Sequence, residues 1–279
     1  MSLLRKILLP MLLGSTCFSC SVNSQVAPKI KQAQSAQSYT PQLYIANTGI
    51  SWGMAWLPNG DMLFTDRDGE LRLVKQELIA DNKGIGKISE KIVKKIEGLP
   101  KIKLGGQGGL LDIAVHPDYA NNGWLYFSYT KAKDKGNKST AIMRAKLHNM
   151  TLTSLEDIYI AQAYGSKGVH FGSRLAFDNQ GYLYFSIGDR GQRDINPQNI
   201  NRDAGKIYRL HDDGRIPKDN PFFLNKLAKK AIYSYGHRNP QGMAKHPITN
   251  DIWTHEHGPR GGDEVNIIAK GKNYGPANN

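Results

Sequence analysis

The feature of this sequence that most constrains its fold is a pattern that occurs four times along the chain. Each copy has a short apolar run, a turn rich in Pro, Asp, Asn or Gly, and a second run rich in aromatic residues, which is typical of a β-hairpin. The copies cover residues 54–66, 113–128, 175–186 and 243–254. With Pro58, Pro117, Asp178 and Pro247 taken as equivalent turn positions, successive copies lie 59, 61 and 69 residues apart. The chain is therefore built from hairpins repeated at a nearly constant interval.

A repeat of this length fits one kind of all-β architecture. A period near 60 residues accommodates a propeller blade of four strands with long loops. The chain has 29 Gly and 13 Pro and no long helical period, with residues 90–96 the best candidate for a short helix. We predict an all-β propeller with about four blades in residues 43–279; a β-sandwich with similar hairpins is the alternative.

The N-terminus has the pattern of an export signal. Arg5 and Lys6 precede an apolar run over residues 7–13, and small and polar residues follow. The apolar run is too short to span a membrane, and the pattern is typical of a secretory signal peptide. We therefore predict a signal peptide over residues 1–20 and a periplasmic or secreted protein.

The two cysteines of the chain, Cys17 and Cys20, both lie in this segment. Either cysteine could carry the lipid of an outer-membrane lipoprotein, although neither follows the usual Leu-small-small pattern. Plain export and a lipid anchor therefore both stay open. Residues 21–42 are rich in Ser, Gln and Ala without apolar periodicity, which predicts a flexible tether.

The chain is strongly basic, with a formal net charge of +13. Such a balance favours anionic partners, among them nucleic acid, an anionic surface or an anionic cofactor. The lysine-rich stretches 83–103 and 131–138 lack the interleaved aromatic residues and modules of nucleic-acid-binding proteins. We therefore predict no nucleic-acid partner and interpret most of these lysines as solvated.

Three short segments offer polar side chains beside the predicted hairpins. A glycine-rich segment, 105–112, contains Gln107, whose amide can donate and accept while the glycines allow close backbone approach. His170 shortly precedes a predicted strand and is a candidate general base. Arg238 and Asn239 form an adjacent pair suited to carbonyl or carboxylate oxygens. For each, a purely structural role in a loop or turn is the alternative.

A fourth segment, residues 255–264, indicates a metal site. His255 and His257 are two residues apart in a predicted strand, so both side chains lie on one face and could bind zinc, but no third ligand is evident. Asp263, Glu264 and loop carbonyls would instead form a hard oxygen site. We favour calcium over zinc.

Taken in order, these segments resemble the soluble aldose sugar dehydrogenases of the glucose/sorbosone dehydrogenase family, which depend on pyrroloquinoline quinone (PQQ). The resemblance extends from about residue 43 to residue 275 and includes the run Gly-His-Arg-Asn-Pro-Gln-Gly. The segments that carry it are 106–112, 170–175, 187–191, 205–210, 216–222, 236–242, 256–264 and 271–275.

The resemblance implies a six-bladed propeller that oxidises the C1 hydroxyl of an aldose to the lactone, with PQQ as hydride acceptor and an unidentified final electron acceptor. It implies that His170 is the base and that Arg238 stabilises charge on the quinone. Gln107 and Asn239 match positions that hold or orient the cofactor.

The resemblance also implies two Ca²⁺ ions. The main-chain carbonyls of Gly258 and Pro259 match ligands of a calcium beneath the quinone. Glu264 and the carbonyl of Tyr274 match ligands of a second, structural calcium.

Two departures from the family pattern bear on activity. Val169 stands where some relatives have an acidic residue. Relatives also continue for about two more blades after residue 275, including cationic residues that hold the cofactor, so we expect a propeller truncated at its C-terminus with open blade edges. The alternatives to an active dehydrogenase are a catalytically inactive truncated propeller that acts as a binding protein, and a metal-dependent sugar lactonase.

Overall fold

The computed structural model describes residues 40–41, 43–80, 86–133 and 136–275. The chain divides into two units, Met1–Tyr44 and Ile45–Asn279. The predicted signal peptide, and the predicted tether except for residues 40 and 41, lie outside the described residues. Within the described residues, no helix is long and apolar enough to span a membrane. The second unit carries the repeated hairpins.

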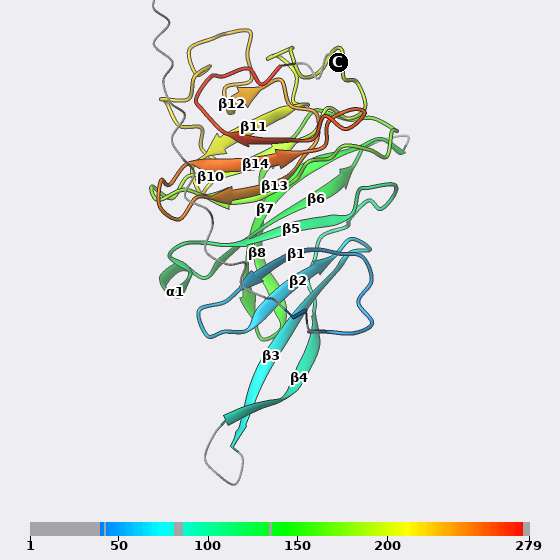
Figure 1. Cartoon of the computed structure of the whole chain (residues 1–279), viewed down its shortest axis with the longest axis vertical. Helices are drawn as coiled ribbons and strands as arrows, with labels where there is room; N and C mark the ends of the chain where they lie inside the picture. The colour runs from blue at the N-terminus through cyan, green and yellow to red at the C-terminus, as the bar shows by residue number, and fades with distance from the viewer. Residues whose placement is uncertain (1–39, 42, 81–85, 134–135, 276–279) are drawn as a thin grey trace, which may run out of the picture. The chain divides into compact units, whose positions relative to one another are not determined.

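The second unit consists of four antiparallel sheets, each formed by strands that follow one another in the chain (Figure 1). The first sheet contains β1 (Ser51–Trp56), β2 (Met62–Asp66), β3 (Glu70–Ala80) and β4 (Gly86–Ile96). The second contains β5 (Leu110–Val115), β6 (Trp124–Ala132), β7 (Lys138–His148) and β8 (Thr151–Ile160), with the short helix α1 (Tyr119–Asn122) between β5 and β6. The third contains β9 (Leu175–Phe177), β10 (Leu183–Ile187), β11 (Lys206–Leu210) and β12 (Ile232–Tyr235). The fourth contains β13 (Pro240–Lys245), β14 (Ile252–Glu256) and β15 (Glu264–Ile267).

The four predicted hairpins are the first two strands of the four sheets. They correspond to β1–β2, β5–β6, β9–β10 and β13–β14. The turns use the chemistry that the sequence indicated: Gly60 has φ +87° and donates its N–H to the carbonyl of Leu57 at 2.9 Å, and the Asp178 carboxylate accepts the N–H of Tyr182 at 2.9 Å. The repeat therefore marks the start of each blade.

The first strands of successive sheets lie side by side, with β1 against β5, β5 against β9 and β9 against β13. This is the arrangement of propeller blades around an axis, and it confirms the all-β propeller prediction with four blades. Blade closure to six remains what the family resemblance implies.

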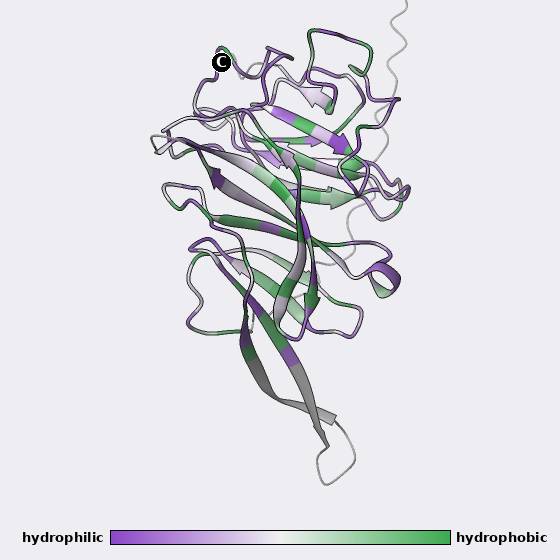
Figure 2. Ribbon diagram, turned by 180° about the vertical axis from the view of Figure 1, so that it is seen from behind, coloured by the Kyte–Doolittle hydropathy of each residue, from purple (hydrophilic) through white to green (hydrophobic). Residues whose placement is uncertain are grey.

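The core lies between successive sheets. Leu63 and Leu71 pack against Phe127 between the first two blades. Phe185 and Tyr208 pack against Tyr126 between the second and third, and the Phe185 and Tyr208 rings stack at 4.8 Å. All residues of β2, β10 and β11 are buried. Neighbouring blades cover both faces of β10 and β11, whereas one face of β2 packs on the second blade and the other packs with Ile45. Figure 2 shows the apolar residues along the strands of these blades.

Strands β1 and β15 carry exposed apolar residues, and one residue from each, Met54 and Val265, lines the same cleft. Met54 and Trp56 of β1 are 61% and 54% exposed, and Val265 and Ile267 of β15 are 69% and 51% exposed.

One local expectation is wrong. Residues 90–96, the best candidate for a short helix, lie in β4, where Ile96 pairs with Leu71 and Lys95 with Arg72 of β3. Pairing with the long neighbouring strand outweighs the helical preference of this short lysine-rich segment.

Candidate active site

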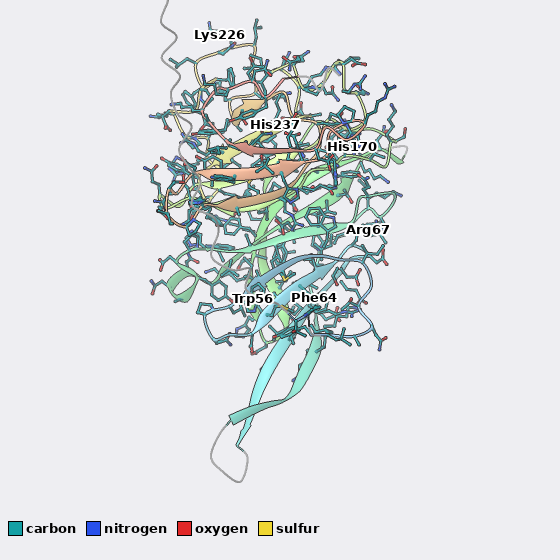
Figure 3. The ribbon with its side chains drawn as sticks, in the orientation of Figure 1. Trp56, Phe64, Arg67, His170, Lys226 and His237 are labelled. Atoms are coloured by element: carbon teal, nitrogen blue, oxygen red, sulfur yellow. The ribbon has the colours of Figure 1, made fainter. Side chains whose placement is uncertain are left out.

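Gln107, His170, Arg238 and Asn239 occupy equivalent places in three successive blades. Gln107 shortly precedes β5, His170 precedes β9, and Arg238 and Asn239 precede β13. Since these three strands are the first of their blades and adjacent ones lie side by side, their N-terminal ends lie close together. Figure 3 shows His170 near the ends of the strands, on the same side of the view as Arg67, which follows β2.

The backbone around His170 is held by the two amide side chains. His170 has φ +53°, a left-handed conformation that costs energy for a non-glycine residue. Its N–H donates to Oε1 of Gln107 at 2.8 Å, and the N–H of Gly172 donates to Oδ1 of Asn239 at 3.3 Å. Within the described residues, neither amide nitrogen has an acceptor. Both side chains thus retain a donor for another group.

The imidazole of His170 faces a buried carboxylate that the sequence reasoning did not assign. Nδ1 of His170 lies 2.7 Å from Oδ1 of Asp189, which is 1% exposed. The same oxygen accepts the N–H of Gly191 at 2.6 Å, whereas Oδ2 of Asp189 is buried without a partner among the described residues. A carboxylate at Nδ1 places the proton there and leaves Nε2 as the basic nitrogen.

A sequence signal for Asp189 existed. It lies three residues after the third predicted hairpin, which ends at residue 186, in the segment 187–191 that contributes to the family resemblance. A carboxylate at the end of a strand is a candidate site residue. His170 precedes β9 and Asp189 follows β10, however, and the sequence pattern does not specify that these two loops meet.

Arg238 is fixed at three points. Its N–H donates to Oε2 of Glu256 at 2.6 Å, and its Nη1 donates to the carbonyl of His257 at 2.7 Å. Its carbonyl accepts the N–H of Asp189 at 2.7 Å. A backbone hydrogen bond therefore joins Asp189, the partner of the candidate base His170, directly to Arg238.

Beneath Arg238 lies a buried pair that sequence reasoning also missed. His237 is fully buried and Glu256 is 4% exposed. Nδ1 of His237 lies 2.8 Å from Oε1 of Glu256, and Nε2 lies 2.9 Å from Oγ of Ser234. Burial raises the pKa of Glu256, but the hydrogen bond and charge of His237 and the N–H groups of Arg238 and Asn239 outweigh it, so the pKa is lowered. The ionised Glu256 thus anchors the Arg238–Asn239 turn.

Three of the four predicted calcium ligands lie at the connection between β14 and β15: Gly258 and Pro259 in the loop and Glu264 at the start of β15. Gly258 donates its N–H to Oδ1 of Asp263 at 3.0 Å, and the Pro259 carbonyl accepts the N–H of Gly262 at 3.0 Å. Glu264 begins β15 opposite Glu256. The calcium ligands remain predictions.

Tyr274, the remaining predicted calcium ligand, lies against the buried pair. Its ring stacks on that of His237 at 4.8 Å.

The geometry gives zinc no support. The ring of His255 packs over Gly242, and Nδ1 of His257 lies 3.5 Å from Oδ2 of Asp263. In the described part of the chain no group of three or more His, Cys, Asp or Glu side chains could hold a metal. A site formed mainly by carbonyls and one carboxylate, as predicted for calcium, would not produce such a group.

The fold and this site define a β-propeller with an oriented His–Asp pair at one end of its inner strands. The glucose/sorbosone dehydrogenase family model matches residues 48–278. The chain belongs to the glucose/sorbosone dehydrogenase family, as the sequence resemblance implied.

Named relatives agree with this assignment. Aldose sugar dehydrogenase YliI of Escherichia coli is 42% identical over 227 residues, which are 80% of this chain and 58% of that protein. Quinoprotein glucose dehydrogenase B of Acinetobacter calcoaceticus is 30% identical, covering 98% of this chain and 59% of that protein. The chain thus spans less than two thirds of the length of these relatives.

Solved structures show the same fold. The soluble aldose sugar dehydrogenase of Escherichia coli in its apo form has a TM-score of 0.71 at 41% identity, and the matched region is 81% of this chain and 62% of that chain. The PQQ-bound aldose sugar dehydrogenase of Streptomyces coelicolor has a TM-score of 0.67 at 28% identity and covers 82% of this chain and 62% of its own.

Proposed function

We propose that this protein oxidises the C1 hydroxyl of an aldose sugar to the lactone, with PQQ as hydride acceptor and an electron acceptor of unknown identity downstream. The observation that carries the proposal is the His170–Asp189 pair at 2.7 Å, beside the backbone of Arg238. Membership of the glucose/sorbosone dehydrogenase family and the PQQ-bound relative support it.

The residues of the chain suit the proton part of this oxidation. Loss of the hydroxyl proton makes departure of the C1 hydride easier, so a base must contact that hydroxyl. Nε2 of His170 would take the proton, and the buried Asp189 would stabilise the imidazolium that forms. Arg238 would lie where negative charge develops on the acceptor.

The donor set fits PQQ and calcium. PQQ, when bound, supplies the two-electron acceptor. The amide donors of Gln107 and Asn239 and the guanidinium of Arg238 suit its carbonyl and carboxylate oxygens. The oxygen donors of Gly258, Pro259, Glu264 and Tyr274 suit a hard cation such as Ca²⁺.

Dye reduction tests the proposal. With the chain, PQQ, Ca²⁺ and an aldose, we expect dye reduction that disappears in His170→Ala and falls by about 10²–10⁴ in Asp189→Asn. His148→Ala, at an exposed histidine at the end of β7, is the matched control and should retain full activity.

A second measurement separates catalysis from binding. PQQ binding, followed by quenching of the chain's tryptophan fluorescence, should persist in His170→Ala. Binding without turnover in the unaltered chain would refute a dehydrogenase and favour the binding-protein alternative.

We also propose that the chain is exported to the periplasm or secreted, with a lipid anchor as an alternative. Cell fractionation and mass spectrometry of the mature N-terminus test this, because a cytoplasmic chain with an intact N-terminus would contradict it.

A further inference from the structure

A cleft of about 510 Å³ lies beside the His–Asp pair but is lined by other residues. One wall is formed by residues 162–167, the other by Arg190, Gln192 and Asn196 together with residues 202–204. Neither His170 nor Gln107, Arg238 or Asn239 lines it. The cleft is therefore distinct from the candidate active site, although Arg190 directly follows Asp189.

Two cationic side chains stand at the surface of this cleft and a third forms part of its wall. Lys167 and Arg202 are exposed. Arg190 is 4% exposed, and its guanidinium lies 3.6 Å from the centroid of the Phe171 ring. The Nε of Arg190 is buried and has no hydrogen-bond partner among the described residues.

Two further buried cations lie next to the cleft. Nζ of Lys206, which is fully buried, donates to the carbonyls of Asn196 and Ala204 at 2.7 Å each, and both of these residues line the cleft. Lys138, which is 7% exposed, donates to the carbonyl of Gly105 at 2.8 Å. Arg190 also donates to main-chain carbonyls, including that of Lys167 at 3.0 Å.

None of these buried cations forms an ion pair among the described residues, although the charge of Asp189 partly compensates Arg190 and that of Asp203 partly compensates Lys206. In the described part of the chain, no carboxylate lies within ion-pair distance of Lys138, Arg190 or Lys206. Burial lowers the pKa of Arg190 to about 10 and that of Lys206 to about 7, and burial together with Arg190 lowers the pKa of Lys138. Each protonated form is thus destabilised where it stands, and a nearby anion would stabilise it.

The acidic residues around the cleft are already engaged. Asp203 accepts the N–H of Gln162 at 2.8 Å and the hydroxyl of Tyr159 at 2.5 Å, and Nζ of Lys229 lies 3.4 Å away. Asp189 bonds His170. The cleft is lined by the cations Lys167, Arg190 and Arg202 and by a single carboxylate, that of Asp203, so its local charge is positive, and low-dielectric walls concentrate such a field.

We propose that this cleft is a binding subsite for an oxyanion, a carboxylate or phosphate group on a small molecule such as a sugar acid or sugar phosphate. Arg202 and Lys167 would contact the anion directly, and the field of the buried Arg190 and Lys138, together with Lys206 in its protonated form, would strengthen its binding. Guanidinium and ammonium groups around a polar cleft suit oxyanions of either kind. This subsite does not depend on the proposed dehydrogenase activity.

Isothermal titration calorimetry of the full chain, without PQQ, tests the subsite. The ligands are D-glucuronate, D-glucose 6-phosphate and, as the neutral control, D-glucose. We expect one or both anions to bind more tightly than D-glucose, which as a neutral aldose reports any binding at the candidate active site. Arg202→Gln should weaken anion binding by about tenfold, and binding should weaken as salt rises.

The matched control is Lys226→Gln, which removes one charge from an exposed lysine that does not line the cleft (Figure 3). Unchanged affinity in this variant supports the subsite. Equal weakening in both variants would show non-specific attraction to a basic protein and overturn the proposal. The proposal would also fail if neither anion bound at about 10 mM, roughly the weakest affinity expected of a specific site. The ratio of the two affinities distinguishes a carboxylate from a phosphate site.

Discussion

Arg174 joins all four blades, and its removal gives the sharpest stability prediction. It lies directly before β9, and its Nε donates to the carbonyl of Gln241 at 2.5 Å. Nη1 donates to Oδ1 of Asp112 at 2.9 Å and Nη2 to the carbonyl of Trp52 at 3.2 Å. The guanidinium also lies 4.1 Å from the centroid of the Trp52 ring. One side chain thus links residues from the first, second and fourth blades to the third.

The substitution Arg174→Met leaves the Asp112 carboxylate, whose side chain is 7% exposed, without its counter-ion. Breaking a buried pair in this way costs about 3–5 kcal/mol. Because the Arg174 side chain is 28% exposed, the low end applies, about 3 kcal/mol. For a unit of this size that corresponds to a fall in Tm of about 6–12 °C.

Thermal unfolding followed by circular dichroism measures this effect. Arg193→Met is the control, because the Arg193–Asp194 pair is exposed at both ends, with side chains 45% and 76% accessible; we expect its Tm to change by less than about 2 °C. Equal Tm values for Arg174→Met and Arg193→Met would refute the role given to Arg174.

The pH dependence provides an independent check. Burial raises the pKa of Asp112 above its ordinary value, and Arg174 opposes that rise. Without Arg174 the pKa of Asp112 in the folded state rises further above its value in the unfolded chain. The folded variant therefore binds a proton at Asp112 more readily than the unfolded chain does. Its stability is then highest below the unfolded pKa and falls as pH rises through the folded one. The deficit of Arg174→Met should therefore shrink as pH is lowered from 7 towards 4, and a constant deficit would contradict the assignment to Asp112.

Two further predictions concern the packing that supports the site. Glu256→Gln removes the charge that pairs with the fully buried His237 and should lower the free energy of unfolding by about 2–3 kcal/mol in urea denaturation; an unchanged midpoint would show that His237 is held by Ser234 alone. Gly172→Ala should destabilise the chain strongly, because φ is +62° and a Cβ would lie 2.8 Å from the backbone nitrogen of Gly188. Gly181→Ala is the comparison, since φ is +80° but no atom lies within 4 Å of the added Cβ; similar losses in both variants would mean that backbone strain, and not crowding, decides the cost.

The local parts of this fold were readable in the sequence. Each hairpin is encoded by two apolar runs and a turn within a dozen or so residues, so the order and spacing of the blades followed from the repeat. The short segment 90–96 was misread, because its conformation depends on pairing with β3 and not on its own composition.

The site divides in the same way. The sequence determined that Gln107, His170, Arg238 and Asn239 precede inner strands, and the resemblance implied their roles. Only the tertiary structure decided their partners, because the contacts of His170 with Asp189 and Gln107 join residues 19 and 63 positions apart on different loops. The same holds for the buried cations beside the cleft and for Arg174. Local propensity determines where the strands and turns begin. Which charged or polar partner a buried group finds depends instead on which loops the packed blades bring together.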